Sequence, residues 1–162
     1  MAARTLVSLW PLFFGLLLVG LASGVQGTLL GFRAEQEGFA DGLTGLVMSS
    51  YFAGFLLGSV WAPRLIDRVG HIRAFAAVSA VASVTILVHA SFVDPWAWAA
   101  MRLVTGLAFS TIFVVTESWL NEAATNESRG RILAAYMVIL LAGTAGGQFL
   151  LTLADPGGFA LF

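Results

Sequence analysis

Three uncharged apolar stretches constrain this chain more than any other feature of its sequence. They cover Leu6 to Phe32, Gly42 to Pro63 and Ala74 to Val93. A helix needs about 20 apolar residues to cross the hydrocarbon core of a bilayer. The composition agrees, because 59% of the residues are hydrophobic and only 10% are charged, against roughly a quarter in soluble domains. The sequence therefore predicts an all-α integral membrane protein.

The expected transmembrane helices follow from these runs and from two further apolar segments. We predict that residues 1–162 form a single transmembrane domain. Its ending, Phe159-Ala160-Leu161-Phe162, is apolar, so we expect the natural reading frame to continue beyond it. The predicted spans are residues 6–31, 43–63, 74–93, 96–119 and 132–153, with a sixth that begins near residue 159.

The segment between the second and third spans sets the expected orientation. It reads RLIDRVGHIR and contains Arg64, Arg68 and Arg73. Short loops rich in Arg and Lys stay in the cytoplasm, so this loop and the N-terminus are predicted to be cytoplasmic. Residues 33–41 carry one Arg and three acids and are predicted to lie outside.

The five tryptophans fit this topology. Aromatic residues gather at the two interfaces of a bilayer. His89, near the outer end of the third span, is expected to be interfacial as well. Trp10, Trp61 and Trp119 are expected at inner span ends, and Trp96 and Trp98 at the outer end.

Several function classes are disfavoured by what the sequence lacks. Without a lysine it has no GxxxxGK[ST] phosphate-binding loop, and without a cysteine it has no thiolate metal site or thiol redox chemistry. His71 and His89 are predicted at opposite membrane faces, so they form no metal pair. We expect no enzymatic activity, no cofactor, no metal and no nucleic-acid partner.

Small residues recur at helical spacing on several predicted spans. Such stripes let helix backbones approach closely in membranes, so we expect them at helix–helix contacts. In the fifth span they include Gly143 and Gly147, and the others are Gly20, Gly24, Gly27 and Gly31 in the first span and Ser50, Gly54, Gly58 and Ala62 in the second.

Three polar side chains within the spans are candidates to face a central cavity. They are Gln26, Tyr51 and Tyr136. A structural role is the alternative, because a single Gln in a span also serves as an interhelical hydrogen-bond donor and a Tyr as a packing residue.

Two motifs resemble those of the major facilitator superfamily (MFS) of transporters. That family joins its second and third helices by a sequence with Asp-Arg-x-Gly and a following basic residue. The fourth span contains Arg102 and Gly106 in the family's Arg-x-x-x-Gly pattern. With this order of spans, the whole chain resembles the N-terminal half of a 12-helix MFS transporter. The loop residues that match are Leu65, Asp67, Arg68, Gly70 and Arg73, with Pro63 where the family has Gly.

The resemblance implies secondary active transport of a small molecule by alternating access, with proton coupling as an expectation. Its implied partners are the lipid bilayer and the C-terminal half of the same transporter, in a bacterial inner (plasma) membrane. It also implies that Asp67 and the loop arginines form a cytoplasmic latch. The expected charged groups near the latch are Glu117, Glu122, Arg129 and Arg131.

Arg102 is the one basic residue that the topology leaves unexplained. It lies about 9 Å past the outer start of its span, and an Arg at mid-membrane costs about 2.5–3.5 kcal/mol on insertion scales. The family match suggests proton coupling or binding of an anionic group, with Gly106 leaving room beside the guanidinium. The alternative is an anchor at the outer interface. For the whole chain, the alternative to a transporter is a structural or assembly subunit of the membrane.

Overall fold

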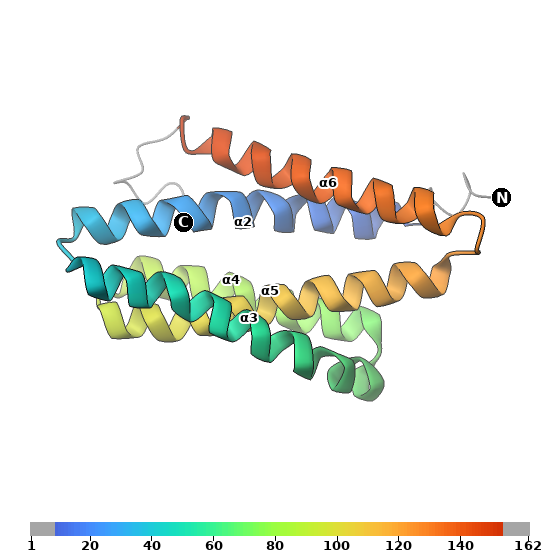
Figure 1. Ribbon diagram of the computed structural model, residues 1–162, viewed down its shortest axis with the longest axis horizontal. Helices are drawn as coiled ribbons and strands as arrows, with labels where there is room; N and C mark the ends of the chain where they lie inside the picture. The colour runs from blue at the N-terminus through green and yellow to red at the C-terminus, as the bar shows by residue number, and fades with distance from the viewer. Residues whose placement is uncertain (1–8, 154–162) are drawn as a thin grey trace. The chain divides into compact units, whose positions relative to one another are not determined.

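The computed structural model describes residues 9–153 and shows five α-helices (Figure 1). All five are long and apolar enough to cross a membrane, and the described residues contain no strand. The prediction of an all-α membrane protein is thereby confirmed. The expected start of a sixth span lies outside the described residues. The helices are α2 (Trp10–Gln36), α3 (Asp41–Val69), α4 (His71–Ser91), α5 (Pro95–Ala123) and α6 (Arg129–Leu150).

The chain divides into two compact units, each described here by itself. One contains α6 and the part of α2 up to Arg33, together with the residues from Trp119 onward. The other covers residues 34–118 and contains α3, α4 and most of α5.

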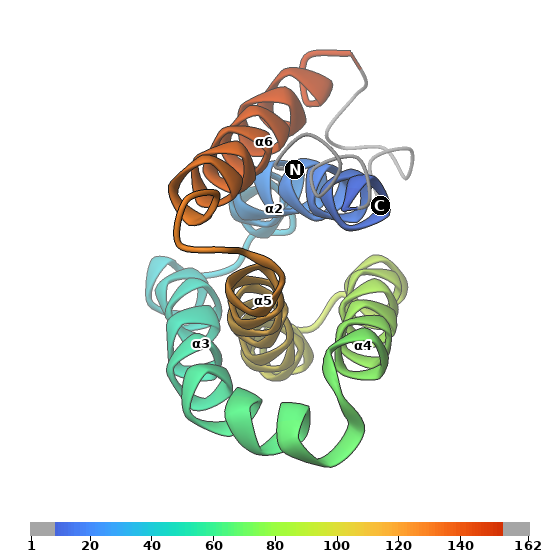
Figure 2. The ribbon, with the colours of Figure 1, turned by 90° about the vertical axis from the view of Figure 1, so that its right-hand side faces the viewer.

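In the first unit, α2 and α6 lie side by side in both views (Figures 1 and 2). Glycines make the contact: a Cβ on Gly20 would lie 2.8 Å from the carbonyl oxygen of Leu140, and one on Gly143 would lie 2.7 Å from that of Leu17. The predicted close packing through these glycines is confirmed. Gly27 differs, because the space at its Cβ position is open.

In the second unit, α5 lies between α3 and α4 (Figure 2). The contact between α3 and α5 has no room for side chains at three glycines. A Cβ on Gly54 or Gly58 would overlap the backbone of Leu103 or Leu107, respectively. From the other helix, a Cβ on Gly106 would overlap the carbonyl oxygen of Tyr51. The two backbones are therefore in direct contact over about a turn and a half of helix.

The connection between α3 and α4 differs from the expected loop. Residues 64–69 continue α3 beyond Pro63, and α4 begins at His71, so only Gly70 is non-helical. The charged residues need contact with water, but they do not need a loop conformation. The helix therefore continues past the end of the apolar run. Gly70 has φ +80°, a conformation that glycine adopts without steric cost. Its N–H still donates to the carbonyl oxygen of Ile66 at 2.8 Å, the last hydrogen bond of α3, and its positive φ ends the helix.

The glycine contact in the second unit gives a test with a matched control on the same helix. Gly54→Ala places a methyl group against the Leu103 carbonyl, so we expect a loss of about 1–3 kcal/mol, typical of overpacking. Gly45→Ala fills open space and should be neutral or stabilising, because Ala favours helices over Gly by about 1 kcal/mol. Thermal unfolding of the full-length protein in detergent measures both. Equal effects of the two substitutions would contradict the packing described here.

Candidate functional site

A buried polar cluster lies where α4 and α5 pack together in the second unit. The hydroxyls of Thr85 and Thr105 form a hydrogen bond of 2.9 Å between the helices. Closer to the connection between the two helices, the rings of His89 and Trp98 are 5.7 Å apart, edge to face. Residues 98, 102 and 105 follow each other at helical steps of four and three, so they share one face of α5. Arg102 therefore lies between the two cross-helix contacts.

Arg102 is the charged member of this cluster, and it is only 5% exposed. Its guanidinium carbon lies 4.5 Å from the ring centroid of Tyr51 on α3. Its Nε is buried without a hydrogen-bond partner, and within residues 9–153 no carboxylate pairs with it. A cation–π contact contributes about 2 kcal/mol or somewhat more when desolvated, whereas the effective penalty for burying an ion is several kcal/mol. The positive charge is thus only partly compensated, and its burial disfavours a role as an interfacial anchor.

The close approach of α3 and α5 puts the Tyr51 ring beside Arg102. Gly106 contacts the backbone of Tyr51 and Phe55, with a distance of 2.9 Å from its Cβ position to the Phe55 nitrogen. We had expected Gly106 to leave room beside the guanidinium, but this room is filled by the backbone of α3. The glycine of the Arg-x-x-x-Gly pattern therefore positions the aromatic partner of the arginine.

His89 and Trp98, which lie at the ends of their helices as expected, are buried within the unit. Each is only 1% exposed. His89 Nδ1 lies 2.7 Å from the carbonyl oxygen of Thr85, and its Nε2 is buried without a partner. The indole N–H of Trp98 donates to the carbonyl oxygen of Phe92 at 2.6 Å. The sequence did carry one signal for this cluster. Arg102 and Trp98 are four residues apart, as are His89 and Thr85, so each pair is predicted to share one face of its helix.

An aromatic contact covers the end of the cluster nearest the predicted outer loop. Phe39, in the connection before α3, packs edge to face on Trp98 with ring centroids 5.1 Å apart. Trp98 in turn contacts the His89 ring. His89 and Arg102 are therefore covered by a short stack that begins in a loop.

The predicted latch residues gather at the other end of this unit. Asp67 and Arg68 lie in the last turn of α3, and Arg73 lies in the first turn of α4, all exposed. Within residues 9–153 the structure records no ion pair for these three residues. His71 Nε2 lies 3.0 Å from the Ser118 hydroxyl of α5. This bond brings the start of α4 to the segment of α5 that carries Glu117.

The remaining predicted residues belong to other parts of the chain. Gln26 on α2 and Tyr136 on α6 are both buried and belong to the first unit. Leu65 is half-buried on α3, and Gly70 is the break described above. The remaining charged residues, Glu122 near the end of α5 and Arg129 and Arg131 at the start of α6, are exposed.

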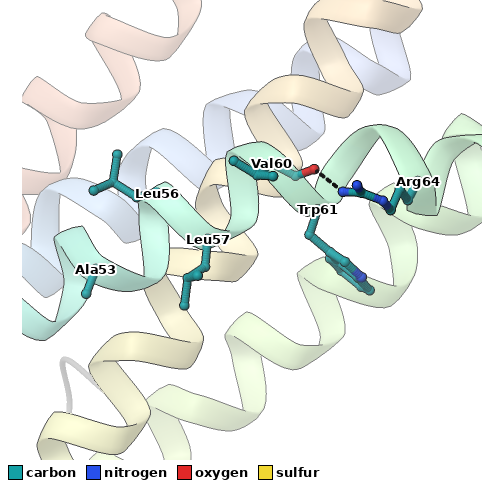
Figure 3. Close-up of a pocket in the computed structure, with 6 residues that line it drawn as sticks. All are labelled: Ala53, Leu56, Leu57, Val60, Trp61 and Arg64. Atoms are coloured by element: carbon teal, nitrogen blue, oxygen red, sulfur yellow. Dashed lines mark hydrogen bonds between the residues drawn. The ribbon is translucent and has the colours of Figure 1, made fainter.

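A hollow on the surface of α3 is a different kind of feature (Figure 3). It contains none of the predicted cavity residues, and its one charged member, Arg64, donates to the carbonyl oxygen of Val60 at 3.2 Å. Exposed apolar side chains of this kind suit lipid or another apolar helix better than a polar solute. The lining residues are Ala53, Leu56, Leu57, Val60, Trp61 and Arg64.

Five membrane-length helices with close glycine contacts and a buried arginine define a polytopic membrane protein. The sequence profile of the Major Facilitator Superfamily matches residues 12–159. The chain belongs to this family, and it is an integral multi-pass membrane protein. The resemblance drawn from the two motifs is confirmed. Transport proteins of this family are generally not enzymes, in line with the expectation from the sequence.

Curated relatives carry transporter descriptions. The chain is 39% identical over 141 residues to an uncharacterized MFS-type transporter, YcaD, of Escherichia fergusonii. Proteins of the same description from Escherichia coli and Salmonella arizonae are 37% and 36% identical over 141 residues. Each alignment covers 87% of this chain and 37% of the relative, so the chain spans little more than a third of their length. No solved structure matches the chain.

The contact between Arg102 and Tyr51 is testable by a double-mutant cycle. Tyr51→Leu removes the ring face and should lower the stability of the full-length protein by about 0.5–2 kcal/mol. Tyr51→Phe keeps the ring and should cost much less. In an Arg102→Gln background the difference between the two substitutions should shrink by the share of the cation–π contact, and what remains belongs to the packing of the Tyr51 ring on Phe55 and Phe109. Thermal unfolding in detergent gives all the values, and a difference of unchanged size without the arginine would refute the contact.

Proposed function

We propose that the chain is the N-terminal half of a secondary active transporter, which moves a small solute by alternating access and is coupled to an ion gradient. Family membership carries this proposal. The Asp67-Arg68-Val69-Gly70 sequence supports it, since it stands at the break between α3 and α4. In such transporters two halves rock about a central site. The partner is then the C-terminal half of the same protein.

The hairpin of α3 and α4 acts as a cytoplasmic latch in this proposal. The positive charge of Arg68 is favourable at the C-terminal end of a helix. The carboxylate of Asp67 is unfavourable there, because its interaction with the helix dipole costs about 0.3–1 kcal/mol. Local energetics therefore do not account for Asp67, and acids do not set membrane orientation. The exposed carboxylate of Asp67, near Gly70, is available to bind a partner in another part of the transporter. Arg68 and Arg73 would pair with Glu117, toward which the bond from His71 to Ser118 brings α4.

Arg102 is the proposed site of ion coupling or of contact with an anionic group. Its burial and its lack of a carboxylate partner within the described residues support this role. The basic latch supports an orientation with the latch on the cytoplasmic side, and the bacterial origin of the relatives supports an inner membrane as the location.

The transport proposal is tested by comparing solutes in cells and medium. Cells that express the full-length protein should change the distribution of at least one small solute, measured by mass spectrometry. A protonophore should abolish the change if the transport is proton-coupled. Asp67→Asn should reduce it at an equal level of protein in the membrane, because the latch is lost. Identical solute profiles with and without the wild-type protein would overturn the proposal.

The proposed orientation has its own test, because the chain contains no cysteine. Single cysteines are introduced at Glu35 and Glu127, both exposed, in a full-length protein freed of other cysteines. A membrane-impermeant maleimide should label Glu35→Cys in intact cells and Glu127→Cys only after permeabilisation. The reverse pattern would show that the latch lies outside.

A further inference from the structure

We propose that His89 and Arg102 together bind the carboxylate of a small substrate, and that His89 takes up a proton when the carboxylate binds. This inference rests on the proposed transport function and adds the chemical class of the substrate. The site belongs entirely to the second unit, with residues from α3, α4 and α5.

The hydrogen bond to Thr85 fixes the tautomer of His89. A carbonyl oxygen only accepts hydrogen bonds, so Nδ1, at 2.7 Å from it, must carry the proton. In the neutral ring Nε2 is then a lone-pair acceptor, and it is buried without a partner. Because the proton on Nδ1 is already held, an added proton goes to Nε2. Protonation turns this atom from an acceptor into a donor.

Arg102 supplies the other half of the site. Its Nε–H is a buried donor without an acceptor, and an unsatisfied buried donor is costly. A guanidinium presents its donors as a planar fork that matches a carboxylate. Because the cross-helix contacts at Thr105 and Trp98 bracket Arg102 on the face of α5 that packs on α4, the arginine and the histidine are neighbours.

The charges around His89 make proton uptake dependent on an anion. Of the titratable groups packed against this cluster, Arg102 comes from α5 and Tyr51 from α3. The remaining titratable residues of α4, His71 and Arg73, lie at its opposite end. A proton on His89 would thus add a second positive charge to a buried site. A bound carboxylate relieves this repulsion, so proton and anion each strengthen the binding of the other, as linkage requires.

Aromatic rings beside Arg102 indicate an apolar body on the carboxylate. Tyr51 lies 6.5 Å from Phe109 and 6.0 Å from Phe55 between ring centroids. Phe113 continues the row, 6.1 Å from Phe55 and 6.2 Å from Phe109. This row runs along α3 and α5 away from Arg102. A head group at the arginine would leave an aromatic ring of the ligand next to these side chains, where stacked or edge contacts are favourable.

Benzoate is the probe for this site, and neutral benzamide is its matched control. Their binding to the purified full-length protein in detergent is measured by calorimetry at about pH 5.5 and about pH 8, which bracket the histidine range. Carboxylic acids titrate near pH 4, so benzoate remains largely ionised at both values. We expect benzoate to bind about 5- to 150-fold more tightly at the lower pH, the usual range of coupling between sites. Benzamide should bind weakly and independently of pH.

Three variants assign the effect to the two residues. Arg102→Gln should weaken benzoate binding roughly 10- to 100-fold, the loss expected for hydrogen bonds to a charged group. His89→Asn keeps a donor for the Thr85 carbonyl but cannot take up a proton, so the pH dependence should disappear. His71→Asn removes the other histidine of the chain and should leave the pH dependence unchanged.

Several outcomes would overturn the inference, and the first two need no variant. They are equal affinities for benzoate and benzamide, and benzoate binding that does not change with pH. Retention of the pH dependence in His89→Asn would also refute the role of the histidine. If benzoate binds as expected but no solute is moved in cells, the transport proposal fails while the site stands. If a solute is moved in cells but benzoate does not bind, the proposed site fails while the transport proposal stands.

Discussion

Direct contact between helix backbones is the constraint on which the described structure depends. Lipid tails are as apolar as leucine, so the hydrophobic effect does little to hold membrane helices together and close packing must do so. In the second unit, Gly54 and Gly58 of α3 meet the backbone of α5, and Gly106 of α5 meets that of α3. This approach does more than stabilise the pair. It sets the height of Tyr51 against Arg102, so the packing glycines also determine the surroundings of the buried charge.

The fold was largely predictable because the bilayer makes a simple demand on the sequence. Apolar length alone identified five helices, and small residues at helical spacing identified which faces would meet. The positions of the helix ends were harder to predict from the sequence. A helix does not stop where the hydrocarbon stops, so α3 continues from Pro63 to Val69 with its charges in helical conformation. Its end depends on Gly70, whose positive φ becomes visible only in three dimensions.

The site was only partly predictable, for a different reason. Arg102 was conspicuous, since a charge within an apolar run has a known cost. His89 and Trp98 were assigned to the interface because each residue alone is typical of one. Their burial follows from the register between α4 and α5, which the bond from Thr85 to Thr105 records. No local pattern determines that register, since it depends on side chains about 20 residues apart in the sequence.

Arg102 and Asp67 differ from the packing residues in their unfavourable local energetics, and this difference is the reason to propose a functional role for both. The buried glycines of the second unit pack on the backbone of a neighbouring helix, and Thr85, Thr105 and Thr111 have hydrogen-bond partners. Arg102 has an aromatic partner but no compensating anion within the described residues, and Asp67 stands at the unfavourable end of a helix dipole. In both cases the chemistry of the missing partner is defined. The arginine needs an anion, and the aspartate needs a hydrogen-bond donor or a cation. A protein that alternates between conformations needs such groups, because an interaction satisfied in only one state shifts the balance between the states.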